Sequence, residues 1–291
     1  MSKPKENVTR IPDFRKIHFL NNYKINEKTF LNKYISFKHL EENITKNEIV
    51  FVSPKTWRDP YEQIYYTAEN YAKYNNYKKP NIFCMCLTEN SSQNEDAAWK
   101  IYQDTTNEKM IKVTFNVTEM LKQLDQYCFA NNFSIYVGKI KYILSRDITT
   151  LSKQSNTKHQ RYFPKKNFSD THYLKLLLLK RKAFEFEREV RIFLIPDDKN
   201  EKYPDDKNAK YPDDIFRIPQ FPYNNETISR LKIAPLQPFP LGDPRQASYA
   251  KLQEYESEIY KEALKNLLPR EFNSEKIRQS ILYKPRKIKK L

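Results

Sequence analysis

The sequence predicts an α+β fold, a single mixed domain with a twisted central sheet and flanking helices. Short apolar runs of strand length are mixed with segments whose apolar residues recur at helical spacing. No break in composition is long enough to be a linker between domains. The 291 residues, 39% of them hydrophobic, can bury one large core or two modest ones. We expect the domain at residues 31–283, after a basic lead-in of residues 1–30 and before a basic tail of residues 284–291.

The first half of the chain alternates short strands with helices. The expected strands are residues 34–37, 49–52, 82–87, 112–116 and 135–144. The expected helices are residues 38–47, 97–102 and 117–129. Leu40 and Ile44 give the first helix an apolar side, and Trp99 and Tyr102 share a face of the second at i,i+3 spacing. An Asp-Pro turn at residues 59–60 closes the loop after the second strand.

In the second half, an apolar helix at residues 173–182 leads into a strand at residues 184–195. An octapeptide then occurs twice within residues 196–214, which indicates an inserted surface loop too short and polar to be a solenoid repeat. The remaining expected elements are strands at 215–218 and 231–233 and a helix at 248–268.

The expected strand at residues 184–195 carries the most informative pattern, beginning F-E-F-E-R-E-V-R. Alternation places Glu185, Glu187, Glu189 and Arg191 on one face. Like charges about 7 Å apart repel, so such a row suits a site whose cationic substrate or transition state compensates it. The alternative is a solvated strand or a helix end, in which Arg188 and Arg191 only neutralise the glutamates.

Composition excludes several classes of site. The only two glycines, Gly138 and Gly242, cannot build a glycine-rich phosphate loop, which excludes P-loop and Rossmann sites. Three cysteines without ligand spacing predict neither a disulfide framework nor a metal site. The four histidines share no spacing, so Ser-His and metal catalysis have little support. No run is long and apolar enough for a membrane span or signal peptide, so we expect a cytoplasmic protein.

The charge balance indicates a polyanionic partner. The chain has 52 Lys and Arg against 36 Asp and Glu, a net charge of +16, together with 21 Tyr and 18 Phe. Such a surface attracts nucleic acid, and its aromatic rings can stack on bases. The candidate phosphate-binding residues of the tail are Lys284, Arg286, Lys287, Lys289 and Lys290. A lysine-rich coding bias gives the same composition without a nucleic-acid role.

An ordered set of short motifs resembles the large bacterial family of domains of unknown function called DUF2971. The motifs are Ser53-Pro54, residues 58–62, a strand cysteine (Cys84 or Cys86), Trp99-x-x-Tyr102, and Phe184 before Glu187-x-Glu189-x-Arg191. Arg58 stands where the family pattern has Asn, and the glycine that follows the Trp-x-x-Tyr helix in the family is absent. The resemblance spans residues 34–283 and implies a family without a known activity.

The Glu187-x-Glu189-Val190 segment is also similar to the final catalytic strand of ADP-ribosyltransferases. Cleavage of the nicotinamide–ribose bond of NAD passes through an oxocarbenium-like cation. The similarity implies that Glu189 stabilises that cation, with Arg191 beside it, and that Glu187 serves the acceptor. It also implies that NAD is bound by residues from the upstream motifs: Tyr34, Ser36, Ser53, Arg58, Trp99 and Tyr102. The opening strand lacks the Arg or His of such enzymes, a role left to His39 or Arg58.

Two alternatives remain open. Asp59 with Glu189-Val190-Arg191 loosely imitates the site of a metal-dependent nuclease, although Arg cannot replace the usual Lys as a base. The other is a basic nucleic-acid-binding module whose glutamates are structural. For the enzymatic interpretations we expect a toxin or antiviral-defence effector in bacterial conflict, controlled by an inhibitor or sensor protein.

Overall fold

A computed structural model describes residues 13–57, 80–89, 95–103, 108–144, 147, 169–197, 214–236, 244 and 248–280. Strands and helices are mixed along the chain, which confirms the predicted α+β class. Most of the 196–214 repeat, Arg58 with the loop that follows it, and the basic tail lie outside the described residues.

The chain forms two compact units, where the sequence predicted a single domain. The first unit comprises Met1–Leu31, Ile49–Glu89 and Val117–Ile218, and the second comprises Asn32–Glu48, Asn90–Asn116 and Pro219–Leu291. Each unit is therefore assembled from three separate stretches. Where a passage between units lies within the described ranges, the chain makes it without a dedicated linker, and its composition carries no boundary signal there.

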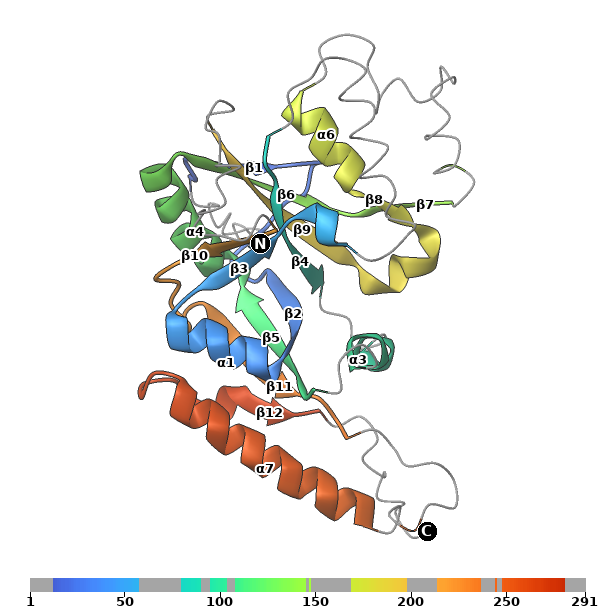
Figure 1. The fold of residues 1–291 in the computed structure, drawn as a ribbon, viewed down its shortest axis with the longest axis vertical. Coiled ribbons are helices and arrows are strands. Elements are labelled where there is room, and N and C mark those ends of the chain that lie inside the picture. Colours follow the sequence, from blue (N-terminus) through green and yellow to red (C-terminus); the bar gives the residue numbers. More distant parts are fainter. Residues whose placement is uncertain are drawn as a thin grey trace, which may run out of the picture. The chain divides into compact units, whose positions relative to one another are not determined.

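The first unit is built on a mixed sheet with β9 (Glu189–Pro196) in its interior (Figure 1). The strand order is β1 (Ile17–Phe19), β6 (Phe133–Lys139), β9, β4 (Phe83–Glu89), β3 (Ile49–Val52) and β10 (Ile215–Ile218). The β1–β6 pair is parallel and the other pairs are antiparallel. Every residue of β9 is buried, which confirms the predicted interior strand from Glu189 onward.

The predicted strand is wrong for residues 184–187. Lys182–Glu187 form a 3₁₀ helix, η4, and Arg188 follows in the left-handed region with φ of 47°. The Arg188 N–H closes the turn onto the Glu185 carbonyl, and Lys180 and Arg181 lie 5.0 and 4.9 Å from the Phe184 ring centroid. These local cation–π contacts keep Phe184 beside the preceding strand, and they stabilise a turn that the alternating pattern does not predict.

Two other expected elements are each divided in two. The predicted strand 135–144 is β6 followed by β7 (Lys141–Ile143), because Ile140 N bonds Glu189 O whereas Lys141 N bonds Leu178 O. The predicted helix 173–182 is α6 (Asp170–Leu177) followed by β8 (Leu179–Arg181), which pairs with β7 in parallel. The leucine run thus continues from a helix into a strand, and its composition does not mark the change.

Helix α6 covers the face of the sheet that carries Phe193 and Ile195. Leu174, Leu177 and Leu178 pack there with these two residues in one hydrophobic cluster. Helix α4 (Val117–Asn131), expected at residues 117–129, packs against β6. A short 3₁₀ helix, η1 (Pro54–Thr56), follows β3.

The described part of the expected lead-in belongs to the fold, so the boundary at residue 30 is wrong. β1 pairs with β6, and the backbone N–H groups of Arg15 and Lys16 donate to the Asp125 carboxylate on α4. Only three residues of β1 pair, which is too short a run for a strand signal in the sequence.

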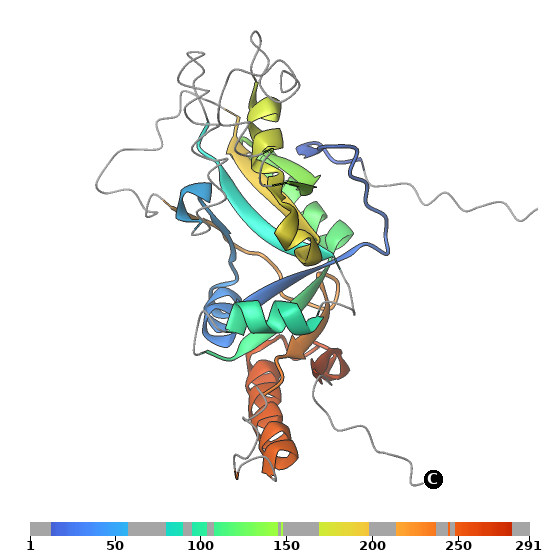
Figure 2. The same cartoon turned by 90° about the vertical axis from the view of Figure 1, so that its right-hand side faces the viewer.

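In the second unit, hydrogen-bonded neighbours follow the order β2 (Phe30–Ser36, from Asn32 onward in this unit), β5 (Met110–Asn116), β11 (Ile228–Ile233) and β12 (Ile277–Gln279). β5 and β11 are antiparallel, and β11 and β12 are parallel. β2 and β5 lie between α1 (Phe37–Lys46) and α3 (Glu95–Gln103) in Figure 1, and α3 crosses in front of them in Figure 2. Helix α7 (Tyr249–Leu267) and the 3₁₀ helix η6 (Ser274–Lys276) complete the unit.

A search of the helices in the described ranges finds none with the length and apolar character required to cross a membrane.

Gly138 on β6 is required by packing. It lies opposite Arg191, and a Cβ there would collide with the Leu178 side chain and lie 3.2 Å from Leu20 Cβ. We predict that Gly138→Ala lowers the free energy of unfolding by about 1–3 kcal/mol, the usual cost of overpacking. Urea unfolding measures the change.

The matched control is Lys139→Ala, the next residue, whose ammonium makes an exposed ion pair with Glu89. That substitution should cost less than about 1 kcal/mol. Equal unfolding midpoints for Gly138→Ala and the parent protein would show that the Leu178 side chain leaves room for a Cβ at position 138.

Candidate functional site

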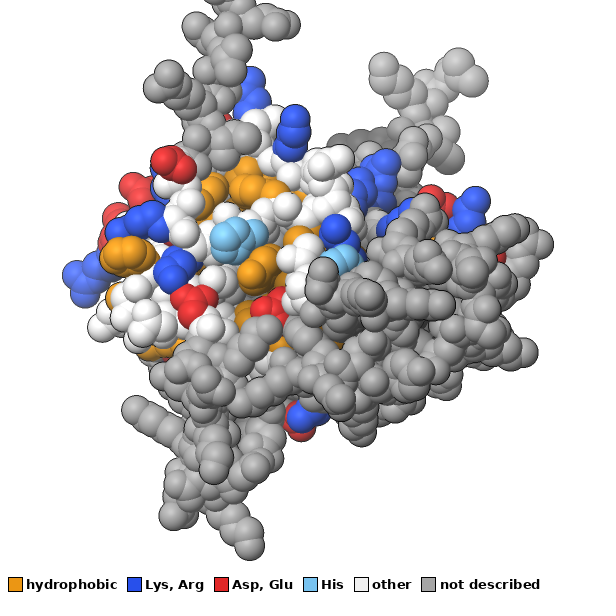
Figure 3. Space-filling view, turned by 90° about the horizontal axis from the view of Figure 1, so that it is seen from above, with side chains coloured by type: hydrophobic (Ala, Val, Ile, Leu, Met, Phe, Trp, Pro, Cys, Tyr) orange, Lys and Arg blue, Asp and Glu red, His pale blue; other side chains and the backbone are white. Residues whose placement is uncertain are grey.

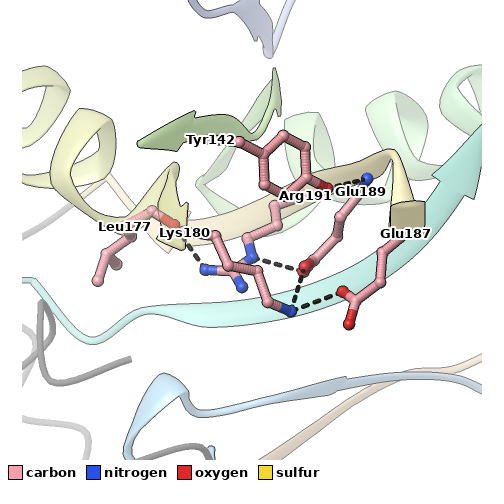
Figure 4. A network of polar contacts seen from close by, with 6 residues as sticks. All are labelled: Tyr142, Leu177, Lys180, Glu187, Glu189 and Arg191. Carbon is pink, nitrogen blue, oxygen red and sulfur yellow. Dashed lines mark hydrogen bonds and ion pairs between the residues drawn. The ribbon is translucent and has the colours of Figure 1, made fainter. Parts of the chain in front are cut away.

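Two charged side chains of β9 meet on one face of the interior strand. Residues two apart on a strand point the same way, and Arg191 Nε donates to Glu189 Oε1 at 2.6 Å (Figure 4). Arg191 lies between Cys86 of β4 and Gly138 of β6 in the strand register. Because Gly138 has no side chain, the Leu178 side chain can lie close to β6 at this position. The predicted partnership of Glu189 and Arg191 is therefore a direct ion pair.

Arg191 is held on three sides and is only 1% exposed. Besides its bond to Glu189, its Nη1 donates to the Leu177 carbonyl at 2.6 Å, at the end of α6. Its guanidinium carbon lies 3.9 Å from the centroid of the Trp57 ring. The last carbonyls of a helix lack partners within the helix, so Arg191 both satisfies one of them and positions Glu189.

Lys180 of β8 joins the second carboxylate to the first. Its Nζ donates to Glu187 Oε2 at 2.6 Å and to Glu189 Oε2 at 2.9 Å (Figure 4). The Glu189 backbone N–H donates to the Tyr142 hydroxyl of β7 at 2.8 Å. Although Glu187 is not on the strand, the turn at Arg188 brings it to the same ammonium. Two carboxylates and two cations thus form one charge-balanced network, called here the carboxylate network: Lys180, Glu187, Glu189 and Arg191.

The two carboxylates have pKa values displaced in opposite directions. Burial alone would raise the pKa of Glu189, but the charges of Arg191 and Lys180 and the Arg191 hydrogen bond lower it to about 2. Burial raises the pKa of Glu187 to about 7, against the opposing charge and hydrogen bond of Lys180, and the Glu189 charge adds to the rise. Near neutral pH one carboxylate is therefore fixed as an anion and the other exchanges its proton.

The predicted NAD-binding residues are divided between the two units. Ser53 is in the first unit, where its side chain caps η1 by accepting from Lys55 N. Ser36 is in the second unit and caps α1 by accepting from His39 N. Helix caps favour serine for its short acceptor side chain, so both serines have a local structural role.

Tyr34 and Trp99 pack together in the second unit. Their rings meet edge to face with centroids 4.9 Å apart, and Trp99 is fully buried against Met110 and Ala234. The backbone of Tyr102 lies in α3, and its side chain is outside the described part. Burial assigns Trp99 to the core of its unit.

Sequence reasoning missed Lys180, Tyr142 and Trp57 as members of the site. Lys180 follows four leucines in a stretch expected to be helical, where it has the pattern of an ordinary solvated lysine. Trp57 carried a signal, since it precedes the Asp-Pro turn of the family motif. Their contacts depend on how β7, β8 and β9 are brought together, which periodicity does not encode.

The described residues contain no candidate metal site, and the face drawn in Figure 3 has no continuous patch of Lys and Arg among its coloured residues. Within them, no group of three or more His, Cys, Asp or Glu side chains is arranged to hold a metal ion. On the face drawn in Figure 3, Lys and Arg side chains are interspersed with acidic and apolar ones among the coloured residues. The candidate nucleic-acid residues of the tail, Lys284 to Lys290, lie outside the described residues.

Glu187→Gln should make stability less dependent on pH. The folded state holds the Glu187 proton more tightly than the unfolded chain, so its contribution is full below pH 4.5 and is lost as pH rises through about 7. Gln has no proton to lose. The variant should therefore gain stability relative to the parent between about pH 5 and about pH 8, measured by urea unfolding.

Glu185→Gln is the control, because it removes an exposed carboxylate from the same 3₁₀ helix. Its stability difference from the parent should stay constant over that range. If the difference for Glu187→Gln also stays constant, the carboxyl of Glu187 is not perturbed in the folded protein.

Comparisons with known proteins do not assign the chain to a family. No protein-family model matches it, and neither a curated protein nor a solved structure matches it. The resemblance to DUF2971 stays a prediction from the motifs.

Proposed function

We propose that this protein is an ADP-ribosyltransferase-like enzyme that cleaves NAD and transfers ADP-ribose to a macromolecule. One observation supports the proposal: Glu187 and Glu189 share the ammonium of Lys180, yet their pKa values are about 7 and about 2. Neighbouring carboxyl groups whose environments separate their pKa values commonly divide acid–base and electrostatic roles in glycosyl transfer.

Glu189 has the properties needed to stabilise an oxocarbenium-like cation. It stays ionised at neutral pH, and its position is fixed by Arg191 on an interior strand. A preorganised charge lowers a transition state more than a mobile one, because little reorganisation accompanies the reaction. As nicotinamide leaves with the bonding electron pair, positive charge develops on the ribose beside this carboxylate.

Glu187 has the properties of a base for the acceptor. A carboxylate with a pKa of about 7 takes a proton effectively near neutral pH. The acceptor atom would form its bond to the ribose carbon while its proton passes to Glu187. NAD is thus a substrate here, and the products are nicotinamide and an ADP-ribosylated acceptor.

Lys180 must be displaced for this chemistry. Its ammonium contacts both carboxylates, and Glu189 is only 4% exposed. The four-carbon stem of lysine is flexible, so a substrate cation can compete for Glu187 or Glu189 while the rigid Arg191 contact remains. The proposal therefore includes a movement of Lys180 on substrate binding.

The nuclease alternative has weaker support. Glu189 already contacts two cationic side chains, and Asp59, its proposed partner in metal binding, lies outside the described residues. A role in bacterial conflict and an inhibitor or sensor partner stay predictions from sequence.

Glu189→Gln should lower NAD cleavage by about 10²–10³ because one electrostatic stabiliser of the transition state is lost. Nicotinamide release from the purified full chain with lysate present measures the rate. Glu185→Gln, an exposed neighbour, should retain the parent rate. No NAD turnover by the parent protein, or equal rates for parent and Glu189→Gln, would contradict the proposal, and fragments that appear only without EDTA would favour the nuclease.

Glu187→Gln should reduce transfer to the acceptor more than hydrolysis of NAD, since water needs less help from a base than a positioned acceptor does. In the parent protein, transfer of labelled ADP-ribose should rise with pH through about 7, the pKa of Glu187, because a base acts in its ionised form. The Gln variant should lose this pH dependence. A parent transfer rate that is constant across this range would exclude Glu187 as the base.

A further inference from the structure

A second charged cluster lies in the other unit, apart from the carboxylate network. Lys112 of β5 and Lys232 of β11 both reach Glu95, the first residue of α3. Lys112 Nζ lies 2.7 Å from Glu95 Oε1, and Lys232 Nζ lies 2.8 and 2.9 Å from Oε1 and Oε2. One carboxylate is therefore shared by two ammonium groups.

Strand pairing forces the two lysines together. Lys112 and Lys232 are directly opposite each other in the antiparallel β5–β11 pair. Like charges at such positions repel, and Lys112 is buried as well. Burial lowers the pKa of Lys112, and the charges of Lys232 and Arg230 add to this effect against Glu95. The cluster thus keeps an unfavourable arrangement of charge inside the fold.

Positive charge exceeds negative charge in this cluster. Arg230 lies two residues before Lys232 on β11, opposite Thr114 of β5. Arg230, Lys232 and Lys112 give three cations, and within the described ranges Glu95 is the one carboxylate that forms ion pairs with Lys112 and Lys232. Lys112 and Lys232, whose side chains are 7% and 16% exposed, share one carboxylate, and such a recessed excess of positive charge is costly unless a counter-ion compensates it.

The sheet face that carries the cluster has polar side chains beside the lysines, and its apolar part is Met110, which packs with Trp99. Thr114 donates to Asn32 Oδ1 at 2.8 Å, and both side chains are buried. The alternating residues on the opposite face are apolar and buried: Ile111, Val113, Leu231 and Ile233. Hydroxyl and amide groups beside ammonium and guanidinium groups are the donors that recognise phosphate oxygens.

We propose that Lys112, Arg230 and Lys232 bind a phosphate group, supplied by the pyrophosphate of a nucleotide or by the backbone of a nucleic acid. Arg230 is exposed and gives access from solvent, whereas the two lysines provide the recessed charge. The site does not use Glu187 or Glu189. Phosphate binding at this site can therefore be tested separately from NAD cleavage.

The test measures binding to the purified full chain. The probes are inorganic pyrophosphate and ADP-ribose by calorimetry, and a labelled single-stranded RNA oligomer by fluorescence anisotropy. Lys232→Met removes one of the three cations and leaves Lys112 paired with Glu95. Lys261→Met is the matched control, because it removes one lysine from α7 in the same unit, where Lys261 pairs with Glu258.

We expect Lys232→Met and Arg230→Gln to weaken binding of at least one probe tenfold or more, with Lys261→Met within twofold of the parent. Inorganic pyrophosphate lacks the ribose that Glu189 would contact, so its binding should be the same in Glu189→Gln as in the parent, even if NAD cleavage is lost. Pyrophosphate or ADP-ribose binding identifies a nucleotide site, whereas binding of RNA alone, with steep salt dependence, identifies a nucleic-acid site. The proposal would be overturned if no probe binds, or if Lys232→Met and Lys261→Met lose the same amount of binding affinity. If Lys232→Met does not fold, the comparison of Arg230→Gln with Lys261→Met takes its place.

Discussion

The ion pair between Arg191 and Glu189 is the constraint on which the rest of the first unit depends. Both charges are buried on the central strand β9, where an unpaired charge would be strongly destabilising. The pair is tolerated because neighbouring groups contact the guanidinium of Arg191. The Leu177 carbonyl at the end of α6 accepts a hydrogen bond from it, and the Trp57 ring stacks on it. Gly138 on the neighbouring strand leaves the space that a side chain would fill.

The same pair creates two different carboxylates. Glu189 is hydrogen-bonded to Arg191 and remains an anion, whereas Glu187 contacts Lys180, and the charges of Lys180 and Arg191 do not offset the effect of its burial. An Arg cannot be deprotonated or easily moved, but a Lys can leave a carboxylate for a competing cation. The network therefore combines a fixed contact, Arg191 with Glu189, and contacts of Lys180 that can be exchanged for those of a substrate. The fixed contact stabilises the interior strand, and the exchangeable contacts make room for the proposed chemistry. The charged cluster of the second unit differs from this balanced network, because its cations Lys112, Arg230 and Lys232 outnumber the carboxylate of Glu95.

Sequence periodicity predicts the elements whose burial is simple. Leu40 and Ile44 predict α1 because they lie on its one buried face. The apolar run after Glu189 predicts an interior strand because all of its residues are buried. The pattern fails at residues 184–187, where cation–π contacts of Phe184 favour a 3₁₀ turn, and at the leucine run that is half helix and half strand. The importance of Glu189 and Arg191 could be predicted from their spacing, but the part played by Lys180 depends on tertiary pairing.

The central claim is that one network holds two carboxyl groups in different protonation states. Carbon-13 NMR of side-chain carboxyls, with Glu187 and Glu189 assigned by their Gln variants, measures this directly during a pH titration. Our account predicts that Glu189 titrates near pH 2 and Glu187 near pH 7, and that Lys180→Met raises the pKa of Glu187 further. Two carboxyl groups that both titrate near their ordinary value of 4.5, unchanged by Lys180→Met, would contradict it.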